Sequence, residues 1–426
     1  MAGKLIVFLC VVVLSKGIDI NSLKLEQVLI LSRHNVRTPL TGKYESYSSK
    51  PWPKWNASAG FLTEKGARLE GYMGQYIAEW LDTEDFMEGC PNQDEVLIYA
   101  NTKPRTLHTA EAFAESAFRF CNISVQHYKN LDVFDPLFLP IFHNTSQAFK
   151  KKFRKEMENK LNEVDLTQSY LELNRILNLR TSDVCKKMYL CELHLQPNKI
   201  SMVDGEEAYV KGPLYIGNSI VDSFIMSYYE GLPISEIAWG QIDTEEKWEL
   251  LTKITKHEQN VRFNLTASTD IAGPLLKYMF DIFKNGTPKF TILIGHDSNL
   301  NSVVSALNMI LSKQYKITLL MGHDANIYTV LKSMGFKPYN LKNQHETIPA
   351  GGKIVFQKWL EEKSGIYFMK VDYIYQCTNQ MREGKTLSMD NPPEFTSLYL
   401  EGCETDKNGF CLWDDFMEIL NSLVEG

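Results

Sequence analysis

The chain has 426 residues, which is enough for two or three average domains or for one large α/β domain with an insertion. Hydrophobic residues make up 44% of the chain and charged residues 23%, an ordinary composition for a soluble globular protein. The net charge is −7 and no basic run occurs, so a nucleic acid is not expected as a partner. Any anion site must therefore be a local group of arginines.

Residues 1–17 predict a secretory signal peptide. A short apolar run from Leu5 to Leu14 is followed by the small residues Ser15 and Gly17. The alternative is an N-terminal membrane anchor, but the run is short for a bilayer span and no later segment is long and apolar enough. We therefore expect a secreted or extracellular protein without a membrane anchor, and a lysosomal destination fits the same signal.

Secretion favours disulfides over metal ligation for the seven cysteines that remain. Cys185/Cys191 and Cys403/Cys411 are close in sequence and could form local disulfides. Cys90/Cys121 would close a longer loop, and Cys377 is left without a partner. A zinc site at Cys185, Cys191 and His194 is the alternative. Glycosylation sequons fit a secreted glycoprotein and occur at Asn56, Asn122, Asn144 and Asn264, with a weaker one at Asn285 because Pro288 follows it.

The first part of the chain alternates between strands and helices. Residues 25–32 predict a strand that is apolar on both faces, as in a buried parallel sheet. Residues 63–81 have helical spacing with Thr63 as the N-cap. Residues 95–100 predict a second apolar strand, and a helix over 105–118 opens directly after it.

The middle of the chain changes character at residues 146–180, which are charged with Leu, Ile and Val at helical spacing, and we interpret 140–275 as a mainly helical insertion. Strands are predicted again at 289–295, 353–359 and 367–376. Alternation at both ends with helices between them predicts an α/β fold with a mainly helical insertion. The expected division is a signal peptide at 1–17, an α/β catalytic domain at 18–139 and 276–426, and a helical insertion domain at 140–275.

An internal repeat lies inside the second α/β segment. Residues 289–314 are echoed from residue 316 onward, so that a Gly-His-Asp at 295–297 returns at 322–324, and the tandem unit spans 289–342. Two copies are too few for a solenoid. A tandem duplication of one strand-loop-helix unit, or two alternative exons joined in one gene model, fits better.

Three of the predicted strands end in polar residues of related type. The first leads into Arg33, His34 and Arg37, the second into Arg105, and the third into His296 and Asp297. Groups just past the carboxyl ends of parallel strands gather in one crevice. Each motif alone is usually a surface turn or a capped helix start, whereas the three together favour one phosphate-ester site.

Each residue type suits a step of phosphate-monoester hydrolysis. Arginines hold a phosphoryl group with planar, permanently charged donors. His34 is the candidate in-line nucleophile, Asp297 the candidate acid for the leaving alkoxide, and His296 a donor to the phosphoryl oxygens. No metal or other cofactor is required, because the arginines and histidines supply the positive charge. An acidic optimum follows if Asp297 must begin protonated.

These residues resemble the histidine acid phosphatases, in the branch with a separate α domain, whose pattern is RHGxRxP plus HD. Asn35 replaces the glycine here, as in a subgroup of periplasmic bacterial glucose-1-phosphatases. The likeness extends to WPKW at 52–55, GPLYIGNSIVD at 212–222 and GCETDKNGFC at 402–411, and it covers essentially the whole mature chain.

The resemblance implies a phosphoglycerate-mutase-like α/β fold with a mostly parallel central sheet. It implies His34 as the nucleophile and Asp297 as the proton donor. It also implies phosphate ligands at Arg33, Arg37, Arg105 and His296, an acidic residue near the sugar at Glu207, and disulfides Cys90–Cys121, Cys185–Cys191 and Cys403–Cys411. Cys377 has no counterpart there, which favours a free thiol. Members of the subgroup also dephosphorylate inositol hexakisphosphate.

The family has one Gly-His-Asp unit, so only one of the two copies can fill the central strand position. Upstream continuity favours the first copy and downstream continuity the second. The first copy has Ser305 where the second has Lys332, and a helix face packed on a sheet disfavours a lysine. We therefore expect the first copy in the site, with His323 and Asp324 of the second copy as the alternative.

The sequence as a whole predicts a secreted acid phosphatase that acts on small phosphate monoesters, sugar phosphates first and phytate second. The alternative is a catalytically silent secreted protein that binds phosphate ligands because the duplication has displaced the acid. A phosphomutase is a weaker third reading, since such enzymes usually serve cytosolic metabolism.

Overall fold

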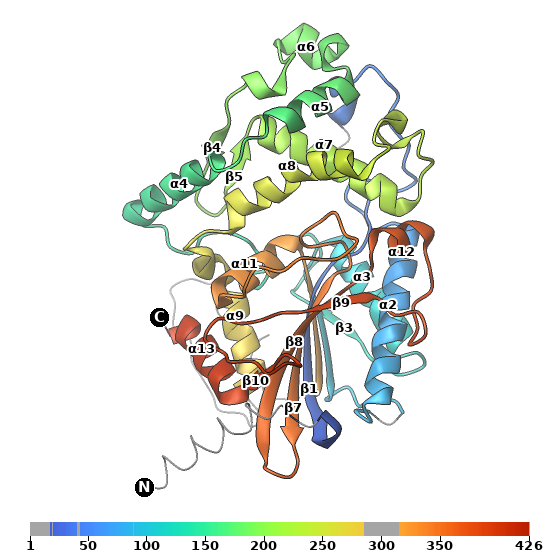
Figure 1. The fold of residues 1–426 in the computed structure, drawn as a ribbon, viewed down its shortest axis with the longest axis vertical. Helices are drawn as coiled ribbons and strands as arrows, with labels where there is room; N and C mark the ends of the chain where they lie inside the picture. The colour runs from blue at the N-terminus through green and yellow to red at the C-terminus, as the bar shows by residue number, and fades with distance from the viewer. Residues whose placement is uncertain (1–17, 19, 41–42, 88, 285–314, 426) are drawn as a thin grey trace.

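A computed structural model describes residues 18, 20–40, 43–87, 89–284 and 315–425. Its centre is an eight-stranded sheet in the order β10-β8-β7-β1-β6-β2-β3, with β9 paired to β8 (Figure 1). The strands are β1 Leu23–Arg33, β2 Val96–Ala100, β3 Val125–His127, β6 Ile317–Gly322, β7 Lys353–Glu361, β8 Ile366–Tyr375, β9 Glu394–Ser397 and β10 Phe410–Leu412.

The strands that carry the site run in one direction. β1, β6, β2 and β3 are parallel neighbours, and β6 pairs with β1 on one side and β2 on the other. β7 is antiparallel to β1, and β8 reverses the direction again. Residues 28–31 of β1 are fully buried on both faces, because helices cover both sides of the sheet. The carboxyl ends of β1, β6 and β2 therefore meet at one edge.

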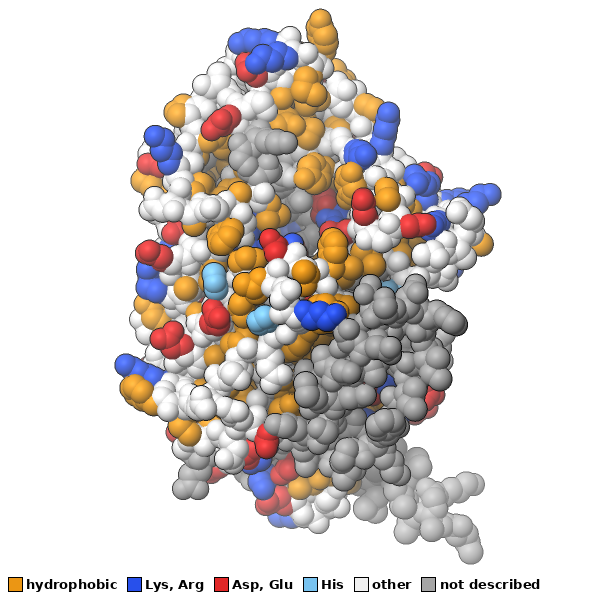
Figure 2. Space-filling view, turned by 180° about the vertical axis from the view of Figure 1, so that it is seen from behind, with side chains coloured by type: hydrophobic (Ala, Val, Ile, Leu, Met, Phe, Trp, Pro, Cys, Tyr) orange, Lys and Arg blue, Asp and Glu red, His pale blue; other side chains and the backbone are white. Residues whose placement is uncertain are grey.

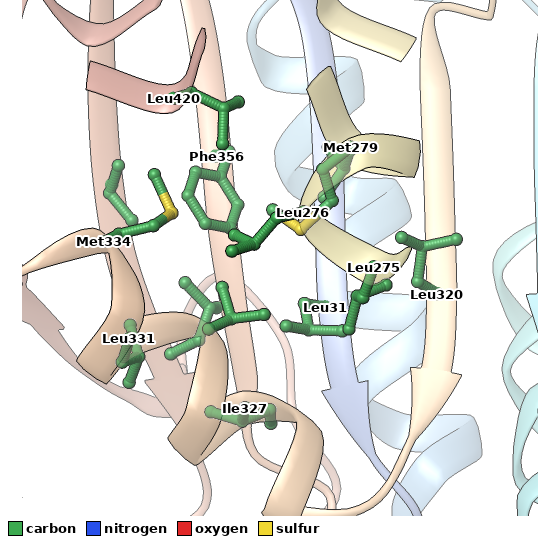
Figure 3. Close-up of a cluster of buried hydrophobic side chains, with 14 of the residues drawn as sticks. Leu31, Leu275, Leu276, Met279, Leu320, Ile327, Leu331, Met334, Phe356 and Leu420 are labelled. Atoms are coloured by element: carbon green, nitrogen blue, oxygen red, sulfur yellow. The ribbon is translucent and has the colours of Figure 1, made fainter. Parts of the chain in front are cut away.

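Two helical layers enclose the sheet (Figure 1). α2 and α3 pack on one face, where Met73, Ile77 and Phe113 are buried, while α9, α11 and α13 pack on the other. Figure 3 shows this second core, in which Leu276 and Met279 of α9 meet Phe356 of β7. The helices of the two layers are α2 Glu64–Thr83, α3 Pro104–Ala117, α9 Ser268–Lys284, α11 Asp324–Met334 and α13 Trp413–Glu425, and a short helix α12 spans Thr378–Glu383.

The insertion forms a separate helical layer above the carboxyl edge of the sheet (Figure 1). Its core is built around α7 and α8, where Ile220, Phe224 and Leu251 are buried. The insertion contains α4 Gln147–Leu161, α5 Thr167–Leu177, α6 Asp183–Met188, a small hairpin of β4 Lys199–Ser201 and β5 Tyr209–Lys211, α7 Pro213–Glu230 and α8 Glu245–Phe263. α9 begins inside the range expected for the insertion but packs on the sheet.

The predicted α/β class with a helical insertion is confirmed, and most strands of the mixed sheet share one direction. The predicted N-cap at Thr63 is also confirmed, because its side chain accepts a hydrogen bond of 2.9 Å from the Gly66 amide. The sequence pattern missed β3, β9 and β10, which have only three or four residues each. Such short strands carry too few alternating positions to be recognised.

The second copy of the repeat occupies the central strand position. β6 is Ile317–Gly322, and His323 and Asp324 follow it at the start of α11. The first copy, with His296 and Asp297, lies outside the described residues, as do the predicted strand at 289–295 and the signal peptide at 1–17. The argument from Lys332 does not apply here, because Lys332 lies on the exposed face of α11 while Ile327, Val330 and Met334 face the sheet.

The three expected disulfides, Cys90–Cys121, Cys185–Cys191 and Cys403–Cys411, are all present, and Cys377 is free. The disulfide at Cys185 replaces the zinc alternative, and His194 instead lies 3.7 Å from Glu192. Asn56, Asn122 and Asn144 are exposed, while Asn264 is half-buried. Among the described residues, no helix combines the length and apolar character that a bilayer crossing needs.

Candidate active site

Three strand ends bring the predicted site residues together. The turn after β1 is tied to the end of β6 by a 3.0 Å hydrogen bond from the His34 amide to the Gly322 carbonyl. The Asn101 amide after β2 donates to the Met321 carbonyl of β6 at 2.9 Å. These bonds extend the parallel ladder past the strands, so Arg33, His34, Arg37, Arg105 and the His323-Asp324 pair line one cavity.

The cavity has a volume of about 810 Å³ and lies between the sheet edge and the helical insertion. Figure 2 shows the rear face of the molecule, where charged side chains gather in a hollow between the two parts. The insertion contributes polar groups that the sequence pattern did not single out: the charged residues Asp222 of α7 and Glu258 and Arg262 of α8, and the neutral amide Gln259 of α8. Such a cavity is large enough for a phosphorylated small molecule.

His34 is held in one orientation. Its Nδ1 lies 2.9 Å from the Asn35 carbonyl oxygen, which can only accept, so Nδ1 carries the proton and Nε2 is free. Its ring is 3% exposed and lies 5.4 Å from the His323 ring. Burial, followed by the charge of Arg105, lowers the pKa of His34 well below its usual range. The imidazole therefore remains neutral and nucleophilic in mild acid.

Two of the three arginines at the cavity floor carry a carboxylate partner. Arg33 donates to Glu346 at 2.8 Å and to the Ile348 carbonyl. Arg37 makes two 3.1 Å hydrogen bonds to the carboxylate of Asp222, the planar fork that carboxylates and phosphates share. These partners hold the guanidinium groups in place before any ligand arrives.

Arg105 is bound differently. Its Nη2 lies 3.4 Å from Nδ1 of His323, whose Nε2 lies 3.3 Å from Asn101. Because arginine can only donate, Nδ1 of His323 is the acceptor and Nε2 carries its proton. Burial and the charge of Arg37 lower the pKa of Arg105 to about 10, so it remains charged at neutral and acidic pH. No carboxylate of the described residues accepts a hydrogen bond from Arg105, which is thus a cation suited to an anionic ligand.

Asp324 begins α11, so the positive end of this helix points at the cavity. Its Oδ2 accepts a 3.2 Å hydrogen bond from Gln259 of the insertion. Burial pushes the pKa of Asp324 up, but the charge of Arg33 and the electrostatic interaction with His323 outweigh that effect and hold the pKa at about 2. The carboxylate is therefore ionised, and an approaching anion that offsets the arginine charges would favour its protonation.

Glu207, carried over as a residue near the sugar, lines the far side of the same cavity. It forms an ion pair with Arg262, which also binds Glu258 at 2.8 Å. Sequence reasoning identified Glu207 only by resemblance and missed Arg262, Glu258, Asp222 and Glu346. A general signal was available: buried arginines need carboxylate partners. The sequence could not say which carboxylates these are, because the partners lie 185 and 313 residues away from Arg37 and Arg33.

His345, next to Glu346, packs against aromatic rings of the helical insertion. Its ring stacks on Trp248 of α8 at 5.1 Å, with Tyr228 of α7 at 6.4 Å. Glu245 lies 3.2 Å from Nδ1, but that carboxylate is 66% exposed, so burial prevails together with the charge of Lys256. The pKa of His345 is lowered to about 4 from 6.5.

We expect the free energy of unfolding to fall as the pH drops from 6.5 towards 4, because only the unfolded state protonates His345 in that window. The loss from this residue is about 3 kcal/mol. Urea titrations across the window measure it. His345→Phe keeps a ring against Trp248 without a titrating group, so its pH slope should be shallower. An unchanged slope would mean that His345 binds its proton equally in both states.

Comparison with known proteins agrees with this geometry. A family model described as the histidine phosphatase superfamily (branch 2) matches residues 24–374. A glucose-1-phosphatase of Providencia rettgeri is 38% identical over 94% of this chain and 92% of its own, and one of Salmonella typhimurium is 36% identical over 94% and 93%. The structure of the phytase from Citrobacter braakii superimposes with a TM-score of 0.81 at 25% identity, covering 94% of this chain and 98% of that one.

Proposed function

The chain belongs to branch 2 of the histidine phosphatase superfamily and is a phosphoric monoester hydrolase, and from that premise we propose that it hydrolyses small sugar phosphates through a phosphohistidine at His34. The observation that supports this mechanism best is the free, unprotonated Nε2 of His34 in the cavity that Arg33, Arg37 and Arg105 also line. A neutral imidazole fixed in this tautomer is an activated nucleophile.

In the first step Nε2 of His34 attacks phosphorus, and the bond from phosphorus to the leaving oxygen breaks. Arg33, Arg37 and Arg105 stabilise the charge on the transferring phosphoryl group. Asp324 donates its proton to the departing alkoxide. The negative charge of the bound phosphate offsets the arginines that otherwise keep the pKa of Asp324 low, so the bound ester itself favours protonation of this acid.

In the second step a water molecule attacks the phosphohistidine. The Asp324 carboxylate accepts a proton from that water, the bond between phosphorus and Nε2 breaks, phosphate leaves, and His34 is restored. The alternative of a silent binding protein assumed an acid displaced by the duplication. Asp324 lines the cavity beside His34, which favours the enzyme.

The substrate class follows from charge matching in the cavity. Arg33 and Arg37 are already paired with carboxylates, and Glu207 and Glu258 share Arg262. Arg105 has no such partner among the described carboxylates and can bind one phosphate, whereas the further phosphates of phytate would have to compete with Glu207 and Glu258 for Arg262 and the lysines of the lining, Lys103 and Lys211. The names of the relatives, glucose-1-phosphatase and phytase, are consistent with this order of preference.

The test is phosphate release at about pH 4.5 with a chelator present, comparing glucose 1-phosphate with phytate. We expect turnover under chelation and a kcat/KM for glucose 1-phosphate at least about tenfold higher, a difference of ~1.4 kcal/mol. A higher value for phytate would overturn the proposed preference, and a folded protein without turnover on either ester would favour the binding-protein alternative.

Secretion is part of the proposal, supported by the disulfides and the exposed sequons.

A further inference from the structure

A fully buried polar network lies beneath the turn that carries His34. Asn35, Glu70 of α2 and Lys353 of β7 are each 0% exposed. Asn35 Nδ2 donates to Glu70 at 2.9 Å, and the Lys353 ammonium donates to the other Glu70 oxygen at 2.6 Å. Lys353 also donates to the Ser32 hydroxyl at 2.9 Å and to the Gly351 carbonyl at 3.2 Å.

The network reaches the candidate nucleophile through the peptide unit of Asn35. Its carbonyl oxygen accepts the hydrogen bond from His34 Nδ1. Its side-chain Oδ1 accepts from the Val36 amide at 2.8 Å. Its amide donates to the Thr109 hydroxyl at 3.2 Å, and that hydroxyl donates to the Arg105 carbonyl at 2.6 Å. The carbonyl that orients His34 is thus held on both sides.

Gly351 completes the arrangement. Its φ of +71° lies in the left-handed region, and a Cβ there would meet Asn35 Nδ2 at 2.4 Å. Its amide donates to the His34 carbonyl at 3.0 Å. The asparagine side chain therefore fits only because the facing residue is glycine, and the close approach locks the start of β7 against the turn.

Stability alone is a weak reason for this arrangement. Removing two charges from water offsets much of their attraction, and apolar residues of similar volume often stabilise a core equally well. Apolar packing fixes the orientation of a side chain only loosely. A buried charge pair with hydrogen bonds to specific neighbouring groups fixes the orientation of those groups more sharply. The residue it grips, Asn35, stands directly beside the nucleophile.

We propose that Asn35, Glu70 and Lys353 are positioning residues, which fix the Asn35 carbonyl so that His34 keeps its proton on Nδ1 and presents Nε2 to the phosphoryl group. This inference rests on the proposed nucleophilic role of His34. It also gives a role to the asparagine that replaces the glycine of the RHGxRxP pattern. The asparagine side chain connects the turn by hydrogen bonds to the interface between the sheet and α2.

The test compares single and paired substitutions. Glu70→Gln and Lys353→Met each leave a buried charge or donor unmatched, so both should lower the melting temperature. The double variant E70L/K353M removes both charges, so its melting temperature should recover. We expect its kcat to remain about 10- to 100-fold below that of the wild type, with KM within about twofold, because the turn is no longer held.

The second readout is the tautomer of His34, observed by nitrogen NMR of histidine-labelled protein and assigned by the signal lost in His34→Ala. The wild type should show a single Nδ1–H tautomer, and E70L/K353M a mixture of both. Asp372→Asn is the matched control. It weakens a buried 2.7 Å hydrogen bond from Gln357 in the same sheet, away from the cavity, and should lower the melting temperature without changing kcat or the tautomer.

A double variant with wild-type kcat and a single Nδ1–H tautomer would overturn the proposal. If that variant does not fold, Asn35→Gly decides alone: a kcat about tenfold lower with mixed tautomers supports the network, and wild-type values of both overturn it. The NMR readout needs no turnover. Loss of the proposed function, seen as an inactive wild type, therefore remains distinguishable from loss of the network, seen as an unchanged tautomer in the variants.

Discussion

Replacing His34 by alanine should reduce kcat by about 10⁴-fold or more, the scale on which the loss of a covalent nucleophile is felt. The buried ring offers Nε2 to the cavity, its pKa is held low by burial and Arg105, and no other unprotonated nitrogen of the described cavity residues is available. Nδ1 of His323 already accepts from Arg105, and its Nε2 carries the proton. No other described group of the cavity can therefore replace His34 in the first step.

The measurement is a rapid quench in alkaline detergent with glucose 1-phosphate that is radiolabelled on its phosphate, because phosphohistidine is stable in alkali and hydrolyses in acid. Wild-type protein should retain acid-labile label at a histidine, and His34→Ala should retain none. His108→Ala is the matched control, since His108 is exposed on α3 outside the cavity lining and its loss should change neither label nor turnover. Label that persists in His34→Ala would place the phosphoenzyme on another residue and refute the mechanism.

Asp324→Asn should lower kcat for glucose 1-phosphate by about 10²- to 10⁴-fold, the range that general acid catalysis contributes. The amide preserves shape and hydrogen bonding to Gln259 but cannot give a proton to an alkoxide. With p-nitrophenyl phosphate the leaving group is a stable anion that needs little protonation. Phosphoenzyme formation from this ester should therefore be far less affected, which separates a lost acid from a disturbed phosphate site.

Asp297→Asn is the matched control for the repeat. The strand between β1 and β2 is Ile317–Gly322 of the second copy, so the carboxylate of the first copy is expected to be dispensable and the variant to retain activity within about twofold. If Asp297→Asn abolished turnover while Asp324→Asn did not, the assignment of the acid to the second copy would be wrong.

The sequence predicted the parts of this fold that rest on local chemistry. The strand at 25–32 and the helix from Thr63 were recognisable from apolar runs and capping alone. The motifs around His34 and Arg105 could be grouped because they follow parallel strands. Arrangement in space was less accessible. Whether Lys332 faces the sheet depends on the rotation of α11, and a repeat gives both copies the same local signals.

The sequence could not predict the carboxylates of the site, for a different reason. Asp222 and Glu346 come from α7 and from the loop before β7, and no pattern in either segment points to Arg37 or Arg33. These carboxylates pair with the arginines only when the insertion packs over the edge of the sheet. That is a tertiary contact, and it produces no periodic pattern in the sequence. Short strands such as β10 were not predicted for a related reason, because their pairing with a neighbouring strand, here β8, is what makes them strands.

The placement of the cavity between two separately packed cores has an evolutionary consequence. Residues proposed to carry out the chemistry follow β1, β2 and β6, whereas Asp222, Glu258 and Arg262 on the opposite wall belong to the insertion. Mutations in α7 and α8 can therefore change which alcohol is accepted while the phosphoryl-transfer residues stay intact. Proteins descended from one ancestor can therefore acquire different substrates through changes in the insertion alone, while the rest of the chain keeps its sequence.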